Sequence, residues 1–183
     1  MPATMMTRTD CLRKYGSDYF VHQKMAAGEL YRLGRNIYTE KKYVPELALL
    51  AYKYPSAVVT MHTAFYLYGM TDVIPDYYDF ATDRDAPKIP DRRVHQYFQP
   101  GNFFNVGVTQ IDHKGYLISI YNRERMLIEL LRYKTKLPFD YYKEIVRYYR
   151  KIIPELDIQM VQDYAFSSPK SNKVFETLQL EVL

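Results

Sequence analysis

The chain of 183 residues contains no tryptophan, one cysteine and four histidines. Cys11 alone cannot form an internal disulfide or a thiolate zinc site, and the histidines lie too far apart to place two ligands on one helix. We therefore expect no metal site, no cofactor and a reducing, cytoplasmic location for the protein.

Long apolar runs are missing too. The longest one, residues 47 to 52, is far shorter than the ~20 residues that cross a bilayer. Residues 1 to 14 contain no apolar core of the signal-peptide kind. The sequence thus predicts no association with a membrane.

Residue patterns that would support catalysis are sparse. Aspartates and Lys88 gather between residues 76 and 88, as in metal-dependent nucleases, but the spacing from Asp85 to Lys88 is one residue too long and Pro87 interrupts the strand. His62 lies among apolar residues, which favours a hydrogen-bonded core histidine over a catalytic base. We expect that the protein is not an enzyme.

What the chain does contain is a globular composition, with 48% hydrophobic residues, 25% charged residues and 20 tyrosines. These values exclude a disordered chain and fit one domain of ordinary size with a small appendage. Many tyrosine rings should be buried, and each buried hydroxyl then needs a hydrogen-bond partner.

The formal charge of +4 comes entirely from residues 1 to 42. This segment holds eight Lys and Arg and four Asp and Glu, whereas residues 43 to 183 hold 17 of each sign. Lysine and arginine that neutralise phosphates release counterions, so a positive end on an otherwise neutral protein indicates an anionic partner. Double-stranded DNA is the first hypothesis.

Residues 7 to 40 have the pattern of two short helices and a hairpin. The first helix is expected over residues 7 to 15, and the second from Ser17 or Asp18 to Gly28. Strands are expected over residues 29 to 32 and 36 to 40. Two helices followed by a basic hairpin predict a small, truncated winged helix-turn-helix in a head of residues 1 to 42.

The second helix should turn Phe20, Val21, Met25 and Ala26 inward and its other face to solvent. Together with the hairpin and the segment after it, the solvent face supplies the candidate DNA-binding residues. These are Tyr19, His22, Gln23, Lys24, Arg32, Arg35, Lys41 and Lys42.

Residues 43 to 183 predict a second domain of mixed structure. Helices are expected over residues 45–54, 58–68, 122–132, 138–153, 157–166 and 172–183, and strands over residues 77–82, 94–98, 106–111 and 116–120. The order predicts an α+β fold with a small antiparallel sheet and a helical C-terminus that packs on the core or on a partner chain.

One face of the helix expected near residue 138 is basic. It carries Lys143, Arg147, Arg150 and Lys151, with Glu144 as its acid. A second phosphate-contacting patch and an ordinary solvated helix face both explain this pattern.

Three segments follow a known order. They are GELYRLGRNIY at residues 28 to 38, PSAVVTMHTAFYLYGMTD at residues 55 to 72, and the stretch from VGVTQID at residue 106 to RERML at residue 123. The first is similar to the wing pattern G-x-L-x-R-L-x-R-G-V-Y, and the set resembles the AbiEi family, the antitoxins and transcriptional regulators of type IV toxin-antitoxin systems. The resemblance covers roughly residues 17 to 135.

Two features differ from the family pattern. The family's winged helix begins with a further helix that has no room before residue 7, and Asn36 takes the place of a wing glycine. Asparagine tolerates a positive φ better than most residues, so the turn can be kept. About 40 residues bury too little apolar surface to fold alone, so the head should pack on the rest of the chain or have a role other than tight DNA binding.

The resemblance implies a DNA-binding regulator of an abortive infection system. It would act as an antitoxin, control its own operon and oppose a nucleotidyltransferase-like toxin without requiring a tight complex. The second helix would enter the major groove, while Arg32 and Arg35 hold phosphates or reach the minor groove. Two alternatives stay open: a protein-interaction module with a degenerate winged helix, and a nuclease or transferase.

Overall fold

The structure, a computed structural model, describes residues 5 to 182 and divides into two compact units. The first unit contains the chain up to Tyr54 together with Ile111–Ile118, and the second contains Pro55–Gln110 and the chain from Ser119 onward. The expected head boundary at residue 42 therefore lies inside the first unit. Leu183, expected as the end of the last helix, lies outside the described residues.

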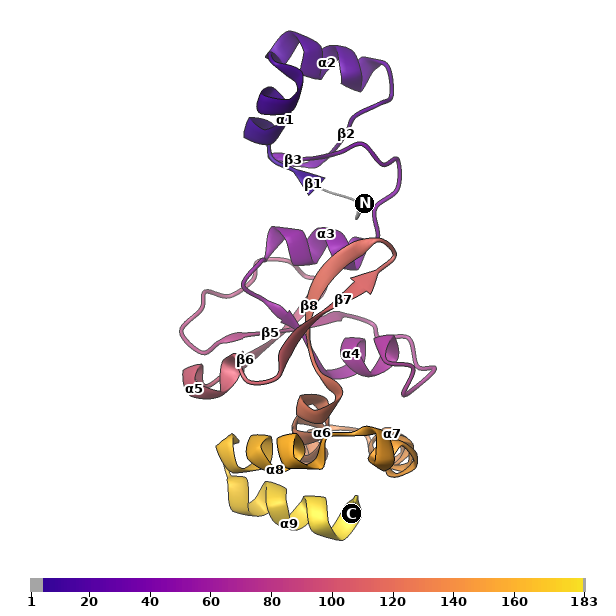
Figure 1. The fold of residues 1–183 in the computed structure, drawn as a ribbon, viewed down its shortest axis with the longest axis vertical. Helices are drawn as coiled ribbons and strands as arrows, with labels where there is room; N and C mark the ends of the chain where they lie inside the picture. Colours follow the sequence, from indigo (N-terminus) through magenta and orange to yellow (C-terminus); the bar gives the residue numbers. More distant parts are fainter. Residues whose placement is uncertain (1–4, 183) are drawn as a thin grey trace. The chain divides into compact units, whose positions relative to one another are not determined.

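The first unit confirms the expected order of two helices and a hairpin (Figure 1). Its elements are β1 (Met5–Met6), α1 (Arg8–Tyr15), α2 (Asp18–Ala26), β2 (Tyr31–Gly34), β3 (Ile37–Thr39) and α3 (Glu46–Lys53). Thr7 and Asp10 form a capping box at the start of α1, and Gly16 ends this helix with a φ of 91°. Cap and stop residues thus define α1 as the sequence predicts.

The three strands of the first unit form an antiparallel sheet in the order β1-β3-β2. Successive strand residues point to opposite faces, so the sheet contributes to two apolar clusters. One cluster joins Met6 and Tyr38 to Cys11, Val21 and Leu30, and the other joins Met5 to Ala48 and Tyr116, with Leu33 and Ile37 packed against it. Both faces of this small sheet are covered, which meets the expectation that the head packs against further parts of the chain.

The second unit contains a mixed sheet and a set of helices (Figure 1). Its elements are β4 (Val58–Val59), α4 (Met61–Leu67), β5 (Tyr78–Asp83), β6 (Val94–Gln99), α5 (Gly101–Phe104), β7 (Val108–His113), β8 (Tyr116–Tyr121), α6 (Arg123–Arg132), α7 (Phe139–Ile152), α8 (Ile158–Ser167) and α9 (Ser171–Glu181), with short 3-10 helices at Lys134–Lys136 and Ile153–Glu155. Residues 111 to 118, at the tip of β7 and β8, belong to the first unit. The α+β class is confirmed.

The sequence predicted a small antiparallel sheet, but the five-stranded sheet, in the order β6-β5-β4-β8-β7, is mixed. Strand β4 pairs antiparallel with β5 and parallel with β8, and β5 pairs parallel with β6. The parallel pairing of β4 with β8 was missed because the prediction placed Val58 and Val59 at the start of a helix. Both valines are buried in the middle of the sheet, where β-branched side chains pack well, and the helix begins only at Met61.

Tyrosine hydroxyls are widely hydrogen-bonded, as their number predicts. Tyr68, Tyr121 and Tyr149 donate to the backbone carbonyls of Tyr121, Phe104 and Arg123 at 2.7 to 2.9 Å. Each of these bonds joins elements that are distant in sequence. Among the described residues, the buried hydroxyls of Tyr54, Tyr116 and Tyr141 have no partner.

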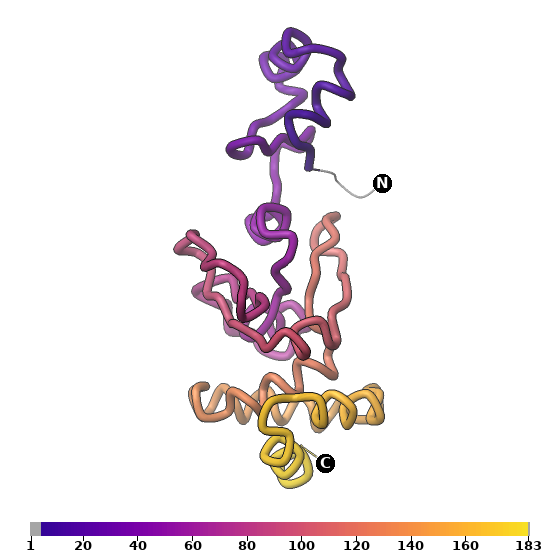
Figure 2. Tube along the Cα trace, turned by 90° about the vertical axis from the view of Figure 1, so that its left-hand side faces the viewer, coloured from indigo at the N-terminus to yellow at the C-terminus, as the bar shows by residue number. Residues whose placement is uncertain are grey.

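The C-terminal helices α6 to α9 pack on one another, as Figure 2 shows in orange and yellow. Asn122 caps α6 by accepting a hydrogen bond from the Arg125 amide at 2.8 Å, and Asp157 caps α8. The last helix buries Val174 and Leu178, so its expected docking on the core is confirmed. None of the helices over residues 5 to 182 is long and apolar enough to cross a membrane.

Candidate nucleic-acid interface

The hairpin of the first unit turns through two residues, Arg35 and Asn36, between the paired Gly34 and Ile37. The expected hairpin had a longer loop that began at Leu33. It is shorter because the register shifts between Arg32 and Gly34, so that Leu33 stays in the strand and packs on the apolar cluster of Met5. The turn therefore presents Arg35 directly at the tip.

Asn36 holds this turn in place in two ways. Its φ is 61°, a left-handed conformation that asparagine adopts more readily than most residues. Its Oδ1 also accepts a hydrogen bond from the Arg8 amide at 2.9 Å, which satisfies one of the free amides at the start of α1. Asparagine thus ties the hairpin tip to α1, a role that the usual glycine could not have.

We expect Asn36→Ala to lower the free energy of unfolding by about 1 to 2 kcal/mol, because alanine loses the hydrogen bond and is strained at a positive φ. Asn36→Gly is the matched variant, since glycine loses the side-chain hydrogen bond but adopts the positive φ without strain. Its effect should be smaller. Urea unfolding of the three proteins measures the difference, and a glycine variant as unstable as the alanine variant would contradict this role.

Four of the eight cations in residues 1 to 42 are neutralised by nearby acids. Arg8 lies 2.8 Å from Asp18, Arg13 lies 3.7 Å from Asp10, and Lys14 lies 2.7 Å from Glu40, while Lys24 pairs with Glu29. Lys14 and Tyr15 both donate to Glu40 and lower the pKa of its carboxyl group. These pairs use all four acids of the segment.

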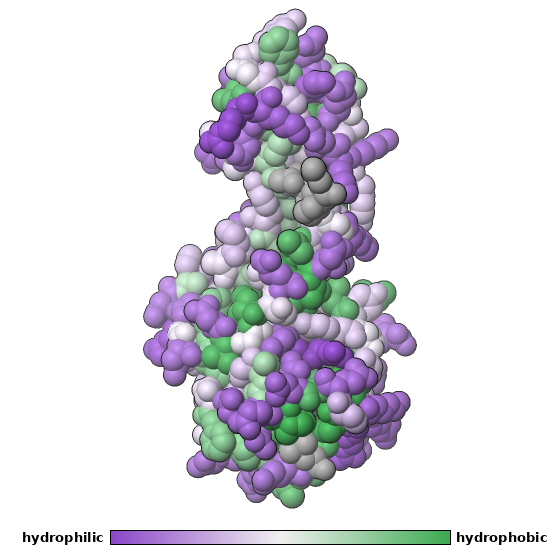
Figure 3. Space-filling model, in the orientation of Figure 1, coloured by the Kyte–Doolittle hydropathy of each residue, from purple (hydrophilic) through white to green (hydrophobic). Residues whose placement is uncertain are grey.

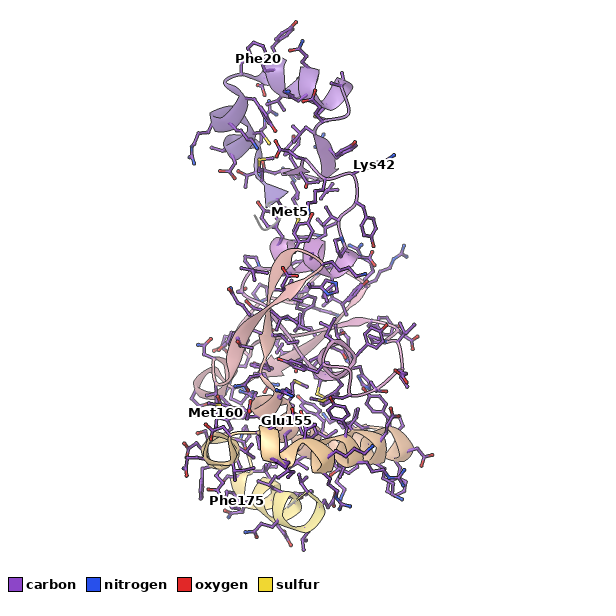
Figure 4. All side chains as sticks on the ribbon, turned by 45° about the vertical axis from the view of Figure 1, so that its right-hand side comes forward. Met5, Phe20, Lys42, Glu155, Met160 and Phe175 are labelled. Atoms are coloured by element: carbon purple, nitrogen blue, oxygen red, sulfur yellow. The ribbon has the colours of Figure 1, made fainter. Side chains whose placement is uncertain are left out.

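The other four cations are Arg32, Arg35, Lys41 and Lys42, which we name the basic stretch. All four are exposed, and no carboxylate among the described residues pairs with them. Arg32 donates from Nε to the Gly34 carbonyl at 3.2 Å, and the Lys41 ammonium lies 5.7 Å from the centre of the Tyr116 ring. Figure 4 shows the Lys42 side chain extending away from the ribbon. The whole net charge of the head is thus concentrated on the hairpin and the segment directly after it.

Helix α2 exposes the residues expected to read bases, together with one that was expected inside. Tyr19, His22 and Gln23 are exposed, whereas Lys24 is half-buried. Phe20, labelled in Figure 4, was predicted to face inward but is 51% exposed. Its ring lies edge-on to the Tyr19 ring, with the ring centres 5.5 Å apart.

The inward face of α2 is narrower than predicted. Val21 is buried and Met25 packs partly, but Ala26 is exposed. One turn separates Val21 from Met25, so Phe20 falls outside the stripe that they define. That spacing was the available signal for an exposed Phe20. On the face shown in Figure 3, hydrophilic side chains predominate over the first unit, with isolated hydrophobic ones among them.

The second basic patch, on α7 of the second unit, is exposed as predicted. Lys143, Arg147, Arg150 and Lys151 all face solvent. Arg150 donates from Nε to the Glu181 carbonyl at 2.8 Å, and the Lys143 ammonium lies 4.1 Å from the centre of the Phe139 ring. Two of its cations are therefore partly engaged within the unit.

His62 has the predicted hydrogen bond but is not a core residue. Its Nδ1 lies 3.1 Å from Oδ2 of the buried Asp79, and its side chain stays about one third exposed. His95 lies 3.3 Å from the other oxygen of the same carboxylate. Asp79 also accepts a hydrogen bond from the His62 amide at 2.8 Å, so it caps α4 from the neighbouring strand. Sequence spacing gave no sign of this arrangement.

Clusters that could hold a metal are not found within residues 5 to 182. Asp83, one of the carboxylates that resembled a nuclease site, accepts a hydrogen bond from the Asp85 amide at 2.9 Å and so shapes a turn. Cys11 is fully buried, and burial raises the pKa of its thiol.

The fold defines a protein of the α+β class, with small sheets and a helical C-terminus. It is similar to the crystal structure of the RV2827C protein from Mycobacterium tuberculosis, with a TM-score of 0.64 and 13% sequence identity over 96% of this chain and 71% of that chain. At this identity the similarity shows the fold alone. No protein-family model and no curated protein matches the chain.

Proposed function

We propose that the first unit is a winged helix-turn-helix head that binds double-stranded DNA, and that the protein is a transcriptional regulator. The observation that carries the proposal is the basic stretch, because the cations that remain without an acid all lie on one hairpin and the segment after it. Four acids neutralise the rest of the head. Such an arrangement favours phosphate contacts over a general positive charge.

The order of the elements supports the same proposal. The order β1-α1-α2-β2-β3 contains the two helices and the hairpin expected of a helix-turn-helix followed by a wing. In that arrangement α2 enters the major groove with Tyr19, His22 and Gln23, and Arg35 at the turn reaches a phosphate or the minor groove. Apolar clusters on both faces of the small sheet support a fixed shape for the hairpin and the two helices.

We further propose that the protein acts as an antitoxin of the AbiEi type. The basis is the resemblance of residues 17 to 135, which implies control of its own operon and opposition to a nucleotidyltransferase-like toxin. An adjacent reading frame that resembles a nucleotidyltransferase would support this assignment. Rescue of growth by this protein when that neighbour is expressed is the direct test, and failure of rescue would contradict it.

A fluorescence titration with duplex DNA from upstream of the protein's own coding region tests the DNA-binding proposal. Four phosphate contacts predict that the logarithm of the affinity falls with the logarithm of the salt concentration with a slope of roughly 3 to 4. Binding should persist on an unrelated duplex with lower affinity. No association with any duplex at low ionic strength would contradict the DNA-binding proposal.

Replacing Gln23 by alanine should change sequence preference more than overall affinity. Glutamine pairs with adenine in the major groove, and each good pair of this kind contributes about 1 to 3 kcal/mol of discrimination. A panel of single-base changes in the bound duplex measures this preference. If all duplexes lose affinity equally, Gln23 contacts the backbone and is not a reader.

The exposed aromatic pair of α2 favours a second candidate, the protein-interaction module. Tyr19 is 70% exposed and stacks with Phe20, and exposed aromatic side chains are common anchors of protein interfaces. Tyr19→Ala with Phe20→Ala distinguishes the two functions. DNA affinity that is unchanged in this double variant, with loss of a protein partner, favours the interaction module.

A further inference from the structure

The second unit contains a cavity of about 270 Å³ between the end of α6 and the start of α9. Five cations line it, and its lining contains no carboxylate. These cations are Arg132, Lys134, Lys136, Lys170 and Lys173. Because residues 43 to 183 hold equal numbers of acids and bases, this concentration is local and not a consequence of composition.

Two of the five cations are already engaged. Arg132 donates from Nη1 to Glu129 Oε1 at 2.6 Å and to Gln99 Oε1 at 2.8 Å, and Lys134 pairs with Glu181. Lys136 lies 5.3 Å from the centre of the Tyr133 ring. Over the described residues, no acid pairs with Lys136, Lys170 or Lys173. Three positive charges thus remain without an acidic partner around one hollow.

Lys170 is held in an unusual conformation at the edge of this cavity. It precedes the first residue of α9 with φ 58° and ψ 42°, the left-handed region that disfavours residues with a Cβ. A glycine at this position would remove that strain, yet the chain carries a lysine, and Lys170 is one of the residues that line the cavity. The amides at the start of the eleven-residue α9 add a further positive field.

The remaining lining is apolar and aromatic, which limits the class of ligand. Leu131, Pro169 and Val174 contribute apolar surface, and the Tyr133 ring is aromatic. An inorganic anion would use only the cations, whereas a ligand with both a phosphate and a planar or apolar group would use the whole lining. The volume is just below the range of about 300 to 1,000 Å³ of small-molecule sites.

We propose that this cavity binds a small phosphorylated molecule of the mononucleotide class. The phosphate contacts Lys136, Lys170 and Lys173, and the base or another planar group packs against Tyr133 and its apolar neighbours. These cations line one hollow of limited volume, which suits one small ligand better than the extended backbone of a nucleic acid. This proposal does not depend on DNA binding by the first unit, so an experiment can contradict either proposal without affecting the other.

Isothermal titration of the full chain with AMP, and separately with inorganic phosphate, tests the proposal. We expect AMP to bind at one site and phosphate to bind more weakly. Lys173→Gln should lower the affinity for AMP about tenfold, as the loss of one hydrogen bond to a charged group implies. Equal affinities for phosphate and AMP would overturn the assignment to a mononucleotide, and no binding of AMP would overturn the site.

Lys170→Gly and a matched control separate the loss of a specific contact from a loss of stability or a general charge effect. Glycine adopts the left-handed conformation freely, so this variant should not lower the midpoint of thermal unfolding. It should nevertheless lower the affinity for AMP about tenfold. Lys88→Gln, which removes the same charge from an exposed loop of the second unit, should leave AMP affinity unchanged. Equal weakening of AMP binding in Lys170→Gly and Lys88→Gln would show a general charge effect and contradict the site.

Discussion

Replacing Arg125 by alanine is expected to lower the free energy of unfolding by about 3 to 5 kcal/mol, the usual cost of removing one partner from a buried ion pair. Arg125 is fully buried in the second unit and donates from Nε to Glu129 Oε1 at 2.9 Å. Its Nη1 donates to the carbonyls of Phe103 and Val106 at 2.6 and 2.7 Å. Alanine would remove one donor from each of these acceptors. Glu129 would keep Arg132 and Gln99 as partners, and the Phe103 carbonyl would keep the Val106 amide.

Arg125 also packs closely against its neighbours, so its side chain contributes more than hydrogen bonds to the second unit. Its guanidinium lies 3.4 Å from the centre of the Phe103 ring and 4.3 Å from that of Tyr121, so it also forms part of the aromatic packing. Burial lowers the pKa of Arg125, and Glu129 opposes that shift. A Cβ on Gly107 would lie 2.5 Å from the Arg125 Cβ, which fixes glycine at that neighbouring position.

Urea unfolding measures this effect, and Arg123→Ala is the matched control. Arg123 begins the same helix, but its pair with Glu155, at 3.2 Å, is exposed. An exposed pair contributes about 0 to 1 kcal/mol, so the control should be nearly as stable as the original protein. Similar losses in both variants would show that the buried network does not stabilise the second unit more than a surface pair does.

Local signals predicted most elements of this fold. Thr7 and Gly16 bound α1, Asn122 caps α6, and Asn36 occupies the hairpin turn, because each residue satisfies a backbone need that is visible in the sequence. Val58 and Val59 were assigned wrongly. A buried central strand of two residues and the first turn of a buried helix are both short apolar runs, and only the pairing of β4 with β5 and β8 separates them.

The candidate site was predictable in composition but not in detail. The count of charges located the excess of four in the head, but any four of the eight cations could have carried it. Arg8 meets Asp18 across the turn between two helices, and Lys14 meets Glu40 across 26 residues. Such pairs depend on tertiary structure, so the sequence could not show that the basic stretch alone remains without acids.

Removing the basic stretch entirely is expected to lower DNA affinity roughly a hundredfold to a thousandfold and to remove most of its salt dependence. The variant replaces Arg32, Arg35, Lys41 and Lys42 by alanine, and each lost phosphate contact should lower the salt slope by roughly one. Because none of the four has an acidic partner among the described residues, their removal leaves no carboxylate unpaired, and the head should stay folded.

Two partial variants and a control identify which part of the stretch contacts DNA. Arg32→Ala with Arg35→Ala tests the hairpin, and Lys41→Ala with Lys42→Ala tests the segment after it, each removing two charges. Arg84→Ala with Lys88→Ala removes the same charge from an exposed loop of the second unit. If this control lowers DNA affinity as much as the hairpin variant does, net charge alone accounts for binding. The hairpin would then not be a wing that contacts the duplex.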